Sequence, residues 1–359
     1  MREIDRIRSA LTAACTRGES VLLITVMSVE GSVYRGAGAR MIVTAGGAST
    51  GAVSGGCLEA DLIARTPEQL ASNRAELVRY DTRASDDAVM GLGMGCQGVI
   101  DLLLEPLTGQ ALERAAEFYT RLAARRDTAT LLTLIRSTGT PTVGTRLLMA
   151  EDGSIVEGNA SLLDHQHDVV TEVVRPTTSL VICGGGTDAI PLADLAKQLG
   201  WHVTVVDHRP SFIERSRFPE ADTLVCANLV NDGNALAGRL EINKRTMAVV
   251  MAHSAAHDRA YLHAMLDGQA RYVGVLGPRR RTIELLGARA LGAESAMPPS
   301  MHSPVGLDLG AETPEEIALA IVAEISAIVA GRDGGMLRGR RGPIHDRPDA
   351  NLKPDALTP

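Results

Sequence analysis

Residues 179–207 read SLVICGGGTDAIPLADLAKQLGWHVTVVD, and this stretch determines the architecture expected for the second half of the chain. A short apolar strand leads into a run of glycines, a helix follows, and a second apolar strand ends at Asp207. Gly184, Gly186 and Ala189 give the spacing G-x-G-x-x-A between the strand and the helix, which is typical of a nucleotide-binding turn. The pattern predicts a Rossmann-like βαβ unit.

Gly184, Gly185 and Gly186 are expected to bind a phosphate group. Without side chains they allow a tight turn, and the N-terminus of the next helix presents free N–H groups to an anion. Asp207 comes about 20 residues after the turn, where Rossmann proteins place the carboxylate that binds a ribose. A glycine helix cap followed by a surface aspartate is the alternative interpretation.

The rest of the second half continues the alternation of strands and helices. Further apolar strands are expected at 223–227, 248–253 and 272–277. This alternation predicts a parallel sheet. A helix is expected over 312–331, because Thr313 can cap it, Pro314 takes the first helical position and Glu316 completes a capping box.

Polar residues follow the later strands of this sheet. His253 ends one strand, and another is followed by Gly277 and the three arginines Arg279, Arg280 and Arg281. Ligands of open parallel sheets bind beyond the carboxyl ends of the strands, so these residues should share a rim with Gly184–Gly186 and Asp207. Guanidinium groups pair with phosphate in a bidentate manner, which favours a phosphate here. A solvated basic turn is the alternative.

The first half predicts a mixed α/β domain. A helix is expected over 1–18, with an apolar face made of Ile4, Ile7, Leu11 and Ala14. Apolar strands are expected at 21–29, 39–44, 49–54, 77–81, 99–107, 130–137 and 146–150, with helices at 58–64 and 110–126. The chain therefore divides into 1–175, a Rossmann-like domain at 176–331 that closes with a C-terminal helix, and a tail at 332–359 that we expect to be disordered.

Two cysteines of the first half lie in glycine loops. Cys57 follows Gly55 and Gly56 and precedes a helix, whose N-terminus favours the thiolate form. Cys96 lies among glycines just before a strand, which would leave its sulfur uncovered. Buried structural cysteines are the alternative for both. The loop GSVYRGAGARM (31–41) adds Arg35 and Arg40, and it predicts either an anion site or a hairpin-type turn.

Composition excludes several classes of function. Lys and Arg number 36 against 43 Asp and Glu, which gives a formal net charge of −7 and disfavours nucleic acid as a partner. No apolar run of about 18 residues predicts a membrane span, and no signal peptide is visible. The odd number of five cysteines, without CxxC pairs, predicts neither a disulfide scaffold nor a structural zinc site. We expect a cytoplasmic protein with reduced thiols.

The motifs as a set resemble the xanthine dehydrogenase accessory factors of the XdhC/CoxI family. The segments that carry the resemblance stand in family order: GSVYRGAGARM (31–41), GAVSGGCLEADL (51–62), GLGMGCQGVIDLLLEPL (91–107), LVICGGGTDAIPLA (180–193), VTVVDHRP (203–210), RFPEAD (217–222), VVMAHSAAHD (249–258), YVGVLGPRRR (272–281) and SPVGLDLGAETPEEIALAIVAEI (303–325). These segments are distributed from residue 31 to residue 325, so the resemblance extends over almost the whole chain except the tail. The glycine turn departs from the family, with Asp188 and Ala189 where Val-Gly is frequent, and an acidic side chain there would repel a pyrophosphate.

The resemblance implies a maturation chaperone rather than an enzyme, with no catalytic residue. Such a protein binds molybdenum cofactor (molybdopterin), supports its sulfuration and delivers it to the large subunit of an apo molybdenum hydroxylase of the xanthine or carbon monoxide dehydrogenase type. Cys57 matches the family's Gly-Gly-Cys motif and is the first candidate for a molybdenum contact; Cys96 is the second. A cysteine desulfurase as a further partner and a homodimer are also expected.

Two other functions remain open from the residues alone. The first is an NAD(P)-dependent oxidoreductase, with Asp207 on the ribose and His253 as acid or base. The second is a nucleotide-binding regulatory protein without redox chemistry. The oxidoreductase gives Cys57 no role. In a cofactor chaperone, Gly184–Gly186 and Arg279–Arg281 would hold the pterin phosphate or a nucleotide such as NAD(P).

Overall fold

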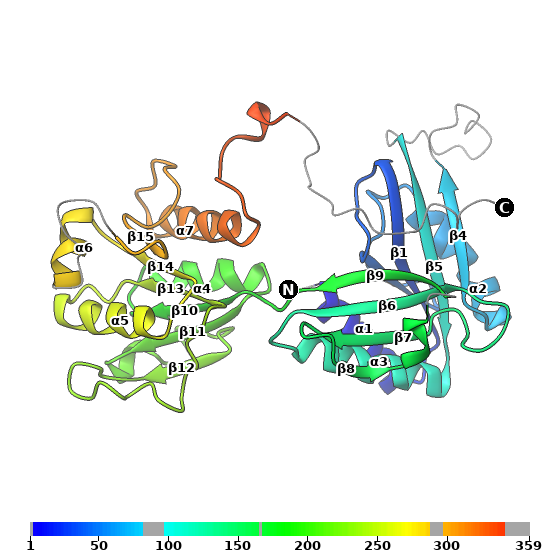
Figure 1. Ribbon diagram of the computed structural model, residues 1–359, viewed down its shortest axis with the longest axis horizontal. Helices are drawn as coiled ribbons and strands as arrows, with labels where there is room; N and C mark the ends of the chain where they lie inside the picture. Colours follow the sequence, from blue (N-terminus) through cyan, green and yellow to red (C-terminus); the bar gives the residue numbers. More distant parts are fainter. Residues whose placement is uncertain (1–2, 82–96, 165–166, 288–296, 342–359) are drawn as a thin grey trace. The chain divides into compact units, whose positions relative to one another are not determined.

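A computed structural model describes residues 3–81, 97–164, 167–287 and 297–341 (Figure 1). The described residues form two compact units, the first ending at Pro176 and the second beginning at Thr177. The N-terminal unit combines helices with two antiparallel sheets, and the C-terminal unit is built on one parallel sheet.

The larger sheet of the N-terminal unit has five strands in the order β3-β2-β1-β5-β4. They are β1 (Val21–Ser32), β2 (Arg40–Thr44), β3 (Ser49–Gly51), β4 (Glu76–Asp81) and β5 (Gln97–Leu107). Side chains alternate between the two faces of β1, as the two-residue period of a strand requires. Leu22 and Ile24 pack toward α2 (Glu59–Ser72), whereas Val21 and Leu23 pack toward the opposite layer.

A second sheet of the same unit has four strands in the order β8-β7-β6-β9. They are β6 (Ala129–Arg136), β7 (Arg146–Ala150), β8 (Ile155–Gly158) and β9 (Asp168–Val174), with the short 3-10 helix η2 (Ala160–Leu163) between the last two. Helices α1 (Glu3–Arg17) and α3 (Gly109–Ala124) share one apolar core with both sheets. Ile7 and Leu11 of α1 are fully buried in this core.

The C-terminal unit contains a six-stranded parallel sheet in the order β12-β11-β10-β13-β14-β15. Its strands are β10 (Ser179–Cys183), β11 (His202–Asp207), β12 (Thr223–Cys226), β13 (Thr246–Val250), β14 (Tyr272–Val275) and β15 (Met301–His302). The chain starts in the middle, winds to one edge and then returns to the other, which is the order of a Rossmann fold. The carboxyl ends of β10 and β13 are therefore adjacent.

Helices cover both faces of this sheet. One core lies between the sheet and α4 (Ala189–Gln198) with α7 (Pro314–Val329), and another lies under α5 (Ala255–Asp267) and α6 (Arg279–Leu286). A 3-10 helix, η3 (Pro210–Phe212), follows β11. Thr313 and Glu316 form the expected capping box at the start of α7.

The expected fold class is confirmed: a mixed α/β unit precedes a Rossmann-like parallel sheet and a C-terminal helix. Several expected strands end too late, because β3 ends at Gly51, β12 at Cys226 and β14 at Val275. β13 ends at Val250, so His253 lies beyond its strand, with a left-handed φ of 57°. The segment after α7 is described as far as Arg341 and contains the short 3-10 helix η5 (Leu337–Gly339). The remainder of the tail lies outside the described residues.

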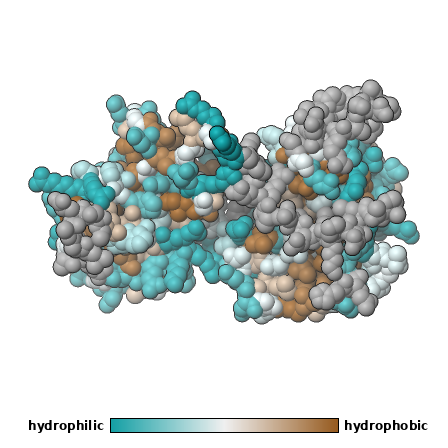
Figure 2. Space-filling view, turned by 45° about the horizontal axis from the view of Figure 1, so that its top comes forward, coloured by the Kyte–Doolittle hydropathy of each residue, from teal (hydrophilic) through white to brown (hydrophobic). Residues whose placement is uncertain are grey.

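Apolar side chains are exposed at several places on the surface. On the face drawn in Figure 2, hydrophobic residues form separate groups among hydrophilic ones. Exposed apolar residues include Ile155, Val173, Leu309 and Leu319. No helix within the described residues combines the length and the apolar character that crossing a bilayer requires.

Candidate functional site

Cys57 lies in a tight loop between β3 and α2. The hydroxyl of Ser54 accepts hydrogen bonds from the backbone N–H groups of Gly56 and Leu58, at 3.2 and 3.1 Å. The thiol of Cys57 points to the same hydroxyl at 3.6 Å and remains partly exposed. Gly56 has a φ of 112°, a region that L residues rarely adopt. Sequence and structure agree that this thiol stands just before a helix.

Glu59 occupies the anion-binding groups of this loop. Its carboxylate accepts hydrogen bonds at 2.8–3.2 Å from the backbone N–H groups of Val53, Ser54 and Gly56, and also from the Ser54 hydroxyl. Burial opposes ionisation, but these bonds outweigh it and hold the pKa of Glu59 below its ordinary value. The loop is thereby fixed in one conformation, and its N–H groups are not open to an external anion.

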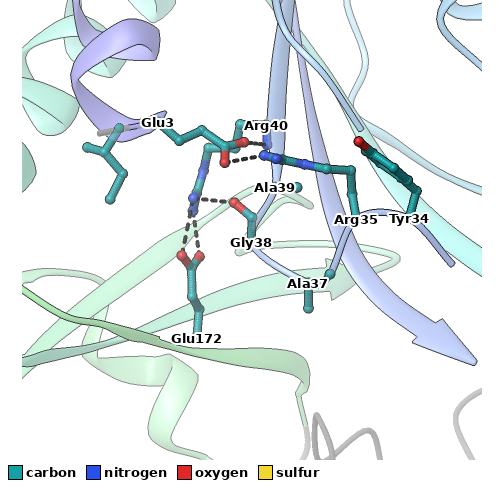
Figure 3. Close-up of a pocket in the computed structure, with 10 residues that line it drawn as sticks. Glu3, Tyr34, Arg35, Ala37, Gly38, Ala39, Arg40 and Glu172 are labelled. Atoms are coloured by element: carbon teal, nitrogen blue, oxygen red, sulfur yellow. Dashed lines mark hydrogen bonds and ion pairs between the residues drawn. The ribbon is translucent and has the colours of Figure 1, made fainter. Parts of the chain in front are cut away.

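A pocket of about 510 Å³ lies beside this loop (Figure 3). It is lined by Glu3, Ile4, Tyr34, Arg35, Gly36, Ala37, Gly38, Ala39, Arg40 and Glu172. The Tyr34 side chain is 71% exposed. A Cβ placed on Gly55 would lie 3.4 Å from the Tyr34 ring, so the glycine packs against one face of that ring. Tyr34 thus connects the pocket with the Gly55-Gly56-Cys57 loop.

The predicted anion ligand Arg40 is a buried structural residue. Its guanidinium pairs with Glu172 at 2.5 and 3.1 Å and also donates to the Gly38 carbonyl and the Tyr119 hydroxyl. Burial lowers the pKa of a guanidinium, but the Glu172 charge overcomes that effect and raises the pKa of Arg40. Since Glu172 lies on β9, this pair ties the two sheets of the N-terminal unit together. Arg35, the other arginine of the predicted anion loop, is the more accessible of the two.

The glycine turn of the C-terminal unit is as tight as the motif predicts. Gly184 has a φ of 120°, and a Cβ there would lie 2.6 Å from the backbone of Ala252. A Cβ on Gly185 would lie 2.2 Å from the carbonyl oxygen of Phe212. Both positions therefore require glycine because two neighbouring segments approach the turn closely.

Asp207 binds the protein's own turn. Its side chain is fully buried and accepts hydrogen bonds from the Gly185 N–H at 2.8 Å, the Arg209 N–H at 2.8 Å and the Arg209 guanidinium at 2.9 Å. Burial opposes ionisation, but the bonds to Arg209 and Gly185 outweigh it and lower the pKa of Asp207 to about 2. With both oxygens engaged, this carboxylate differs from the ribose ligand that its spacing predicts.

His253 stands over the glycine turn, as expected, although it is not on a strand. A Cβ on Gly186 would lie 3.7 Å from the His253 ring. The ring nitrogen Nε2 lies 3.3 Å from the carboxylate of Asp188, and the His253 side chain is 58% exposed. The position where a Rossmann protein would bind a pyrophosphate thus faces a carboxylate and a histidine.

The arginines after β14 divide into two kinds. Arg281 reaches the buried carboxylate of Asp258, which also accepts a hydrogen bond from the Ala252 N–H at 2.7 Å. Arg280 is 92% exposed and pairs with Glu284 on its own helix. Gly277 has a φ of 116° and Arg279 opens α6 at the surface. Among the described contacts, the predicted rim therefore unites the glycine turn, Asp207 and His253, but neither Arg279 nor Arg280 touches them.

The remaining cysteines have varied surroundings. Cys96 lies outside the described residues. Cys183 is buried on β10, and burial raises the pKa of its thiol. Within the residues that the structure describes, no group of three or more His, Cys, Asp or Glu side chains could hold a metal ion.

Several residues of the pocket could not be recognised from the sequence. Glu3 and Glu172 carry no local signal, because they reach Arg35 and Arg40 across separations of 32 and 132 residues. Tyr34 does carry one, since only 3% of the chain is aromatic and this tyrosine sits in a glycine-rich loop. Glu59 can be seen in the sequence two residues after Cys57, but its hydrogen bonds to the loop backbone cannot be predicted from the sequence.

Comparison with known proteins agrees with this architecture. Residues 180–325 match the family model of the XdhC Rossmann domain, and residues 14–81 match that of the XdhC and CoxI family. A Bacillus subtilis protein, named as a probable xanthine dehydrogenase subunit, is 33% identical over 343 residues, which cover 90% of this chain and 97% of that protein. The Escherichia coli molybdenum cofactor insertion chaperone PaoD is 23% identical over 316 residues, covering 88% and 85% of the two chains.

A solved structure extends the likeness to three dimensions. The crystal structure of a Bacillus halodurans protein, described as a xanthine dehydrogenase, superposes with a TM-score of 0.78 at 29% identity. The match covers 93% of this chain and 97% of that one. Fold and site together define a class of two-unit α/β proteins, in which one unit presents a cysteine on a glycine loop and the other carries a Rossmann-like sheet. The chain belongs to the XdhC and CoxI family.

Proposed function

We propose that this protein is an accessory chaperone that binds molybdenum cofactor, supports its sulfuration and delivers it to an apo molybdenum hydroxylase of the xanthine or carbon monoxide dehydrogenase type. The observation that carries the proposal is the partly exposed Cys57 thiol, held on a hydrogen-bonded glycine loop beside a pocket of about 510 Å³. Family membership and the chaperone PaoD among the relatives support a maturation role.

The chemistry of the loop suits a cargo that already carries a metal. A thiolate is a soft ligand and matches a metal centre held by sulfur. Only the Ser54 hydroxyl, at 3.6 Å, is a hydrogen-bond partner of the Cys57 sulfur in the described contacts, so a ligand competes with one weak bond. The carboxylate of Glu59 fixes the loop and disfavours free anions there, which favours a cargo that approaches through its metal rather than through its phosphate.

The C-terminal unit is proposed to serve as a scaffold or a docking module. Asp207 already binds Gly185 and Arg209, and Asp188 faces the phosphate position of the turn. Both features argue against a tightly bound dinucleotide, so no observation favours the NAD(P)-dependent oxidoreductase. An NADH oxidation by the purified protein with a defined substrate would overturn the chaperone proposal.

The proposal includes partners and a location. The large subunit of a molybdenum hydroxylase receives the cofactor, and a cysteine desulfurase supplies sulfur for its sulfuration. A homodimer in the cytoplasm is the form in which we expect the protein to act. The family relatives named for xanthine dehydrogenase support the first of these partners.

A transfer assay tests the proposal. The protein is loaded with molybdenum cofactor and mixed with an apo hydroxylase of the xanthine dehydrogenase type, and the appearance of hydroxylase activity is followed. Wild type should accelerate activation relative to free cofactor, and Cys57→Ala should lose at least 90% of that acceleration. Cys226→Ala, which removes a comparably exposed thiol from β12, serves as the matched control and should behave as wild type.

Two results would contradict the proposal in different ways. If the wild-type protein does not accelerate activation, the chaperone function is wrong. If Cys57→Ala activates the hydroxylase as well as wild type does, the thiol has no part in it.

A further inference from the structure

The pocket beside Cys57 contains an anion site that is filled by a side chain of the protein itself. The carboxylate of Glu3, in the first turn of α1, pairs with the guanidinium of Arg35 and accepts the backbone N–H of Arg40 at 2.5 Å. Figure 3 shows both groups converging on this carboxylate among the residues that line the pocket. Two donors, one on the loop before β2 and one at the first residue of β2, thus meet a single negative group.

This site retains an unused donor. The Nε of Arg35 is buried and has no hydrogen-bond partner among the described residues. A carboxylate has only two oxygens, and those of Glu3 are engaged with the other two donors. A phosphate monoester carries three acceptor oxygens and a larger charge, so it could satisfy all three donors at once. The donor set therefore fits a phosphate better than the carboxylate that occupies it.

The Glu3 carboxylate is partly exposed, so an anion from solvent can reach it and compete for its donors. About a third of each side chain of the Glu3–Arg35 pair is exposed, in contrast to the buried guanidinium of Arg40. An anion that replaces Glu3 would take over the bonds to the Arg35 guanidinium and the Arg40 N–H, so the exchange leaves no buried donor unpaired. Rotation of one side chain at the start of a helix would open the site without moving the fold.

The aromatic ring of Tyr34 belongs to the same pocket as the anion site, and Tyr34 directly precedes Arg35 in the sequence. A Cβ on Gly55 would be in van der Waals contact with the Tyr34 ring, so this glycine lies close to the ring, and Tyr34 is largely exposed. Planar heterocycles stack on the faces of such rings. Gly55 and Cys57 are two residues apart, so their Cα atoms lie within about 7 Å of each other. The ring thus belongs to the residue before Arg35 and lies next to the first residue of the Gly55-Gly56-Cys57 loop.

We propose that the Tyr34–Arg35 pocket binds the phosphate monoester of a planar heterocyclic ligand, and that Glu3 occupies this subsite until the phosphate displaces it. This inference rests on the proposed function, since the heterocycle would be the pterin of the cofactor whose metal meets Cys57. It moves the phosphate site from the glycine turn of the C-terminal unit to the N-terminal unit. There the ring and the phosphate lie beside the thiol loop.

The experiment uses the oxidised, fluorescent pterin derivative of the cofactor, with its phosphate and after phosphatase treatment. Affinities for the full-length protein are measured by fluorescence titration. Wild type should bind the phosphorylated probe at least tenfold more tightly than the dephosphorylated one. Glu3→Gln should tighten binding of the phosphorylated probe severalfold and leave the other unchanged. Arg35→Gln should abolish the preference.

Glu19→Gln is the matched control, because Glu19 also pairs with an arginine at the surface of the same unit. It should leave both affinities unchanged, and thermal unfolding should show that all variants are folded. An unchanged preference in Arg35→Gln, weaker or equal binding in Glu3→Gln, or no phosphate preference in wild type would each overturn the subsite.

The outcome is separable from that of the proposed function. If intact cofactor is bound and transferred while the phosphate makes no difference, only the subsite is wrong. If the phosphorylated probe is preferred through Arg35 while no cofactor is transferred, the subsite stands and the chaperone function is wrong.

Discussion

At the scale of single residues, Asp207 illustrates how a fold can keep a motif and change its use. Its place after the glycine turn is that of a ribose ligand in a dinucleotide-binding protein. Here Arg209 and Gly185 take its oxygens, and the carboxylate fastens the turn to the end of β11. The same charge that would select a nucleotide instead stabilises the loop.

Asp207 should make the stability of the protein depend on pH in acid. Because its pKa of about 2 in the folded state lies below its unfolded value, the ionised carboxylate stabilises the fold above pH 4. The stabilisation is about 2 kcal/mol and is lost as the pH falls from 4 toward 2. The Tm difference between wild type and Asp207→Asn should therefore be constant near neutrality and shrink below pH 4.

A suitable control is Asp308→Asn, which changes an exposed aspartate of the same unit. Its Tm should follow that of wild type over the whole pH series. An Asp207→Asn difference that persists unchanged down to pH 3 would show that the hydrogen bonds of this carboxylate do not favour its charged form.

At the scale of elements, buried ion pairs connect the two sheets of the N-terminal unit. Arg40 of β2 meets Glu172 of β9, and Arg146 of β7 meets the buried Glu105 of β5 at 2.5 Å. Both guanidinium groups lie within about 6 Å of the Tyr119 ring centre, at 5.6 and 6.0 Å. An arginine buried in this way is stable only with its carboxylate, because an unpaired buried charge is costly.

Glu172→Gln should therefore destabilise the N-terminal unit by about 3 kcal/mol, since it leaves the Arg40 guanidinium buried without a counter-charge. The free energy of unfolding in urea measures this effect. Glu157→Gln is the comparison, because Glu157 of β8 pairs with the half-exposed Arg121 and should cost about 1 kcal/mol or less. Equal losses in the two variants would contradict a role of the buried pair in joining the sheets.

At the scale of the whole molecule, periodicity predicts most elements but not the contacts that define the site. The three-glycine turn, the helix caps of Thr313 and Glu316 and the apolar faces of α1 are local, so adjacent residues reveal them. Strands β8 and β9 lack such a signal. β8 is short and largely exposed, and β9 carries Thr171 and Glu172 within its apolar run.

The residues of the candidate site are easier to predict than their roles. Cys57 and the glycines around it can be located because helix and loop signals surround them. The partners of Arg40 and Asp207 cannot be located in this way. The carboxylate that pairs with Arg40 lies 132 residues away. The sequence does not tell whether Asp207 binds a ligand or, as in the structure, the backbone N–H of Gly185. The charged residue is visible in the sequence, whereas its hydrogen-bond partner is determined by tertiary packing.

The most direct test of the chaperone function is binding of molybdenum cofactor by the purified protein, with wild type beside Cys57→Ala. Protein is titrated with cofactor, separated by equilibrium ultrafiltration, and bound cofactor is quantified by fluorescence after oxidation. Saturable binding that weakens at least tenfold in Cys57→Ala, about 1.4 kcal/mol, is the predicted result. Equal binding by both proteins, or binding by neither, would contradict a cofactor chaperone that acts through this thiol.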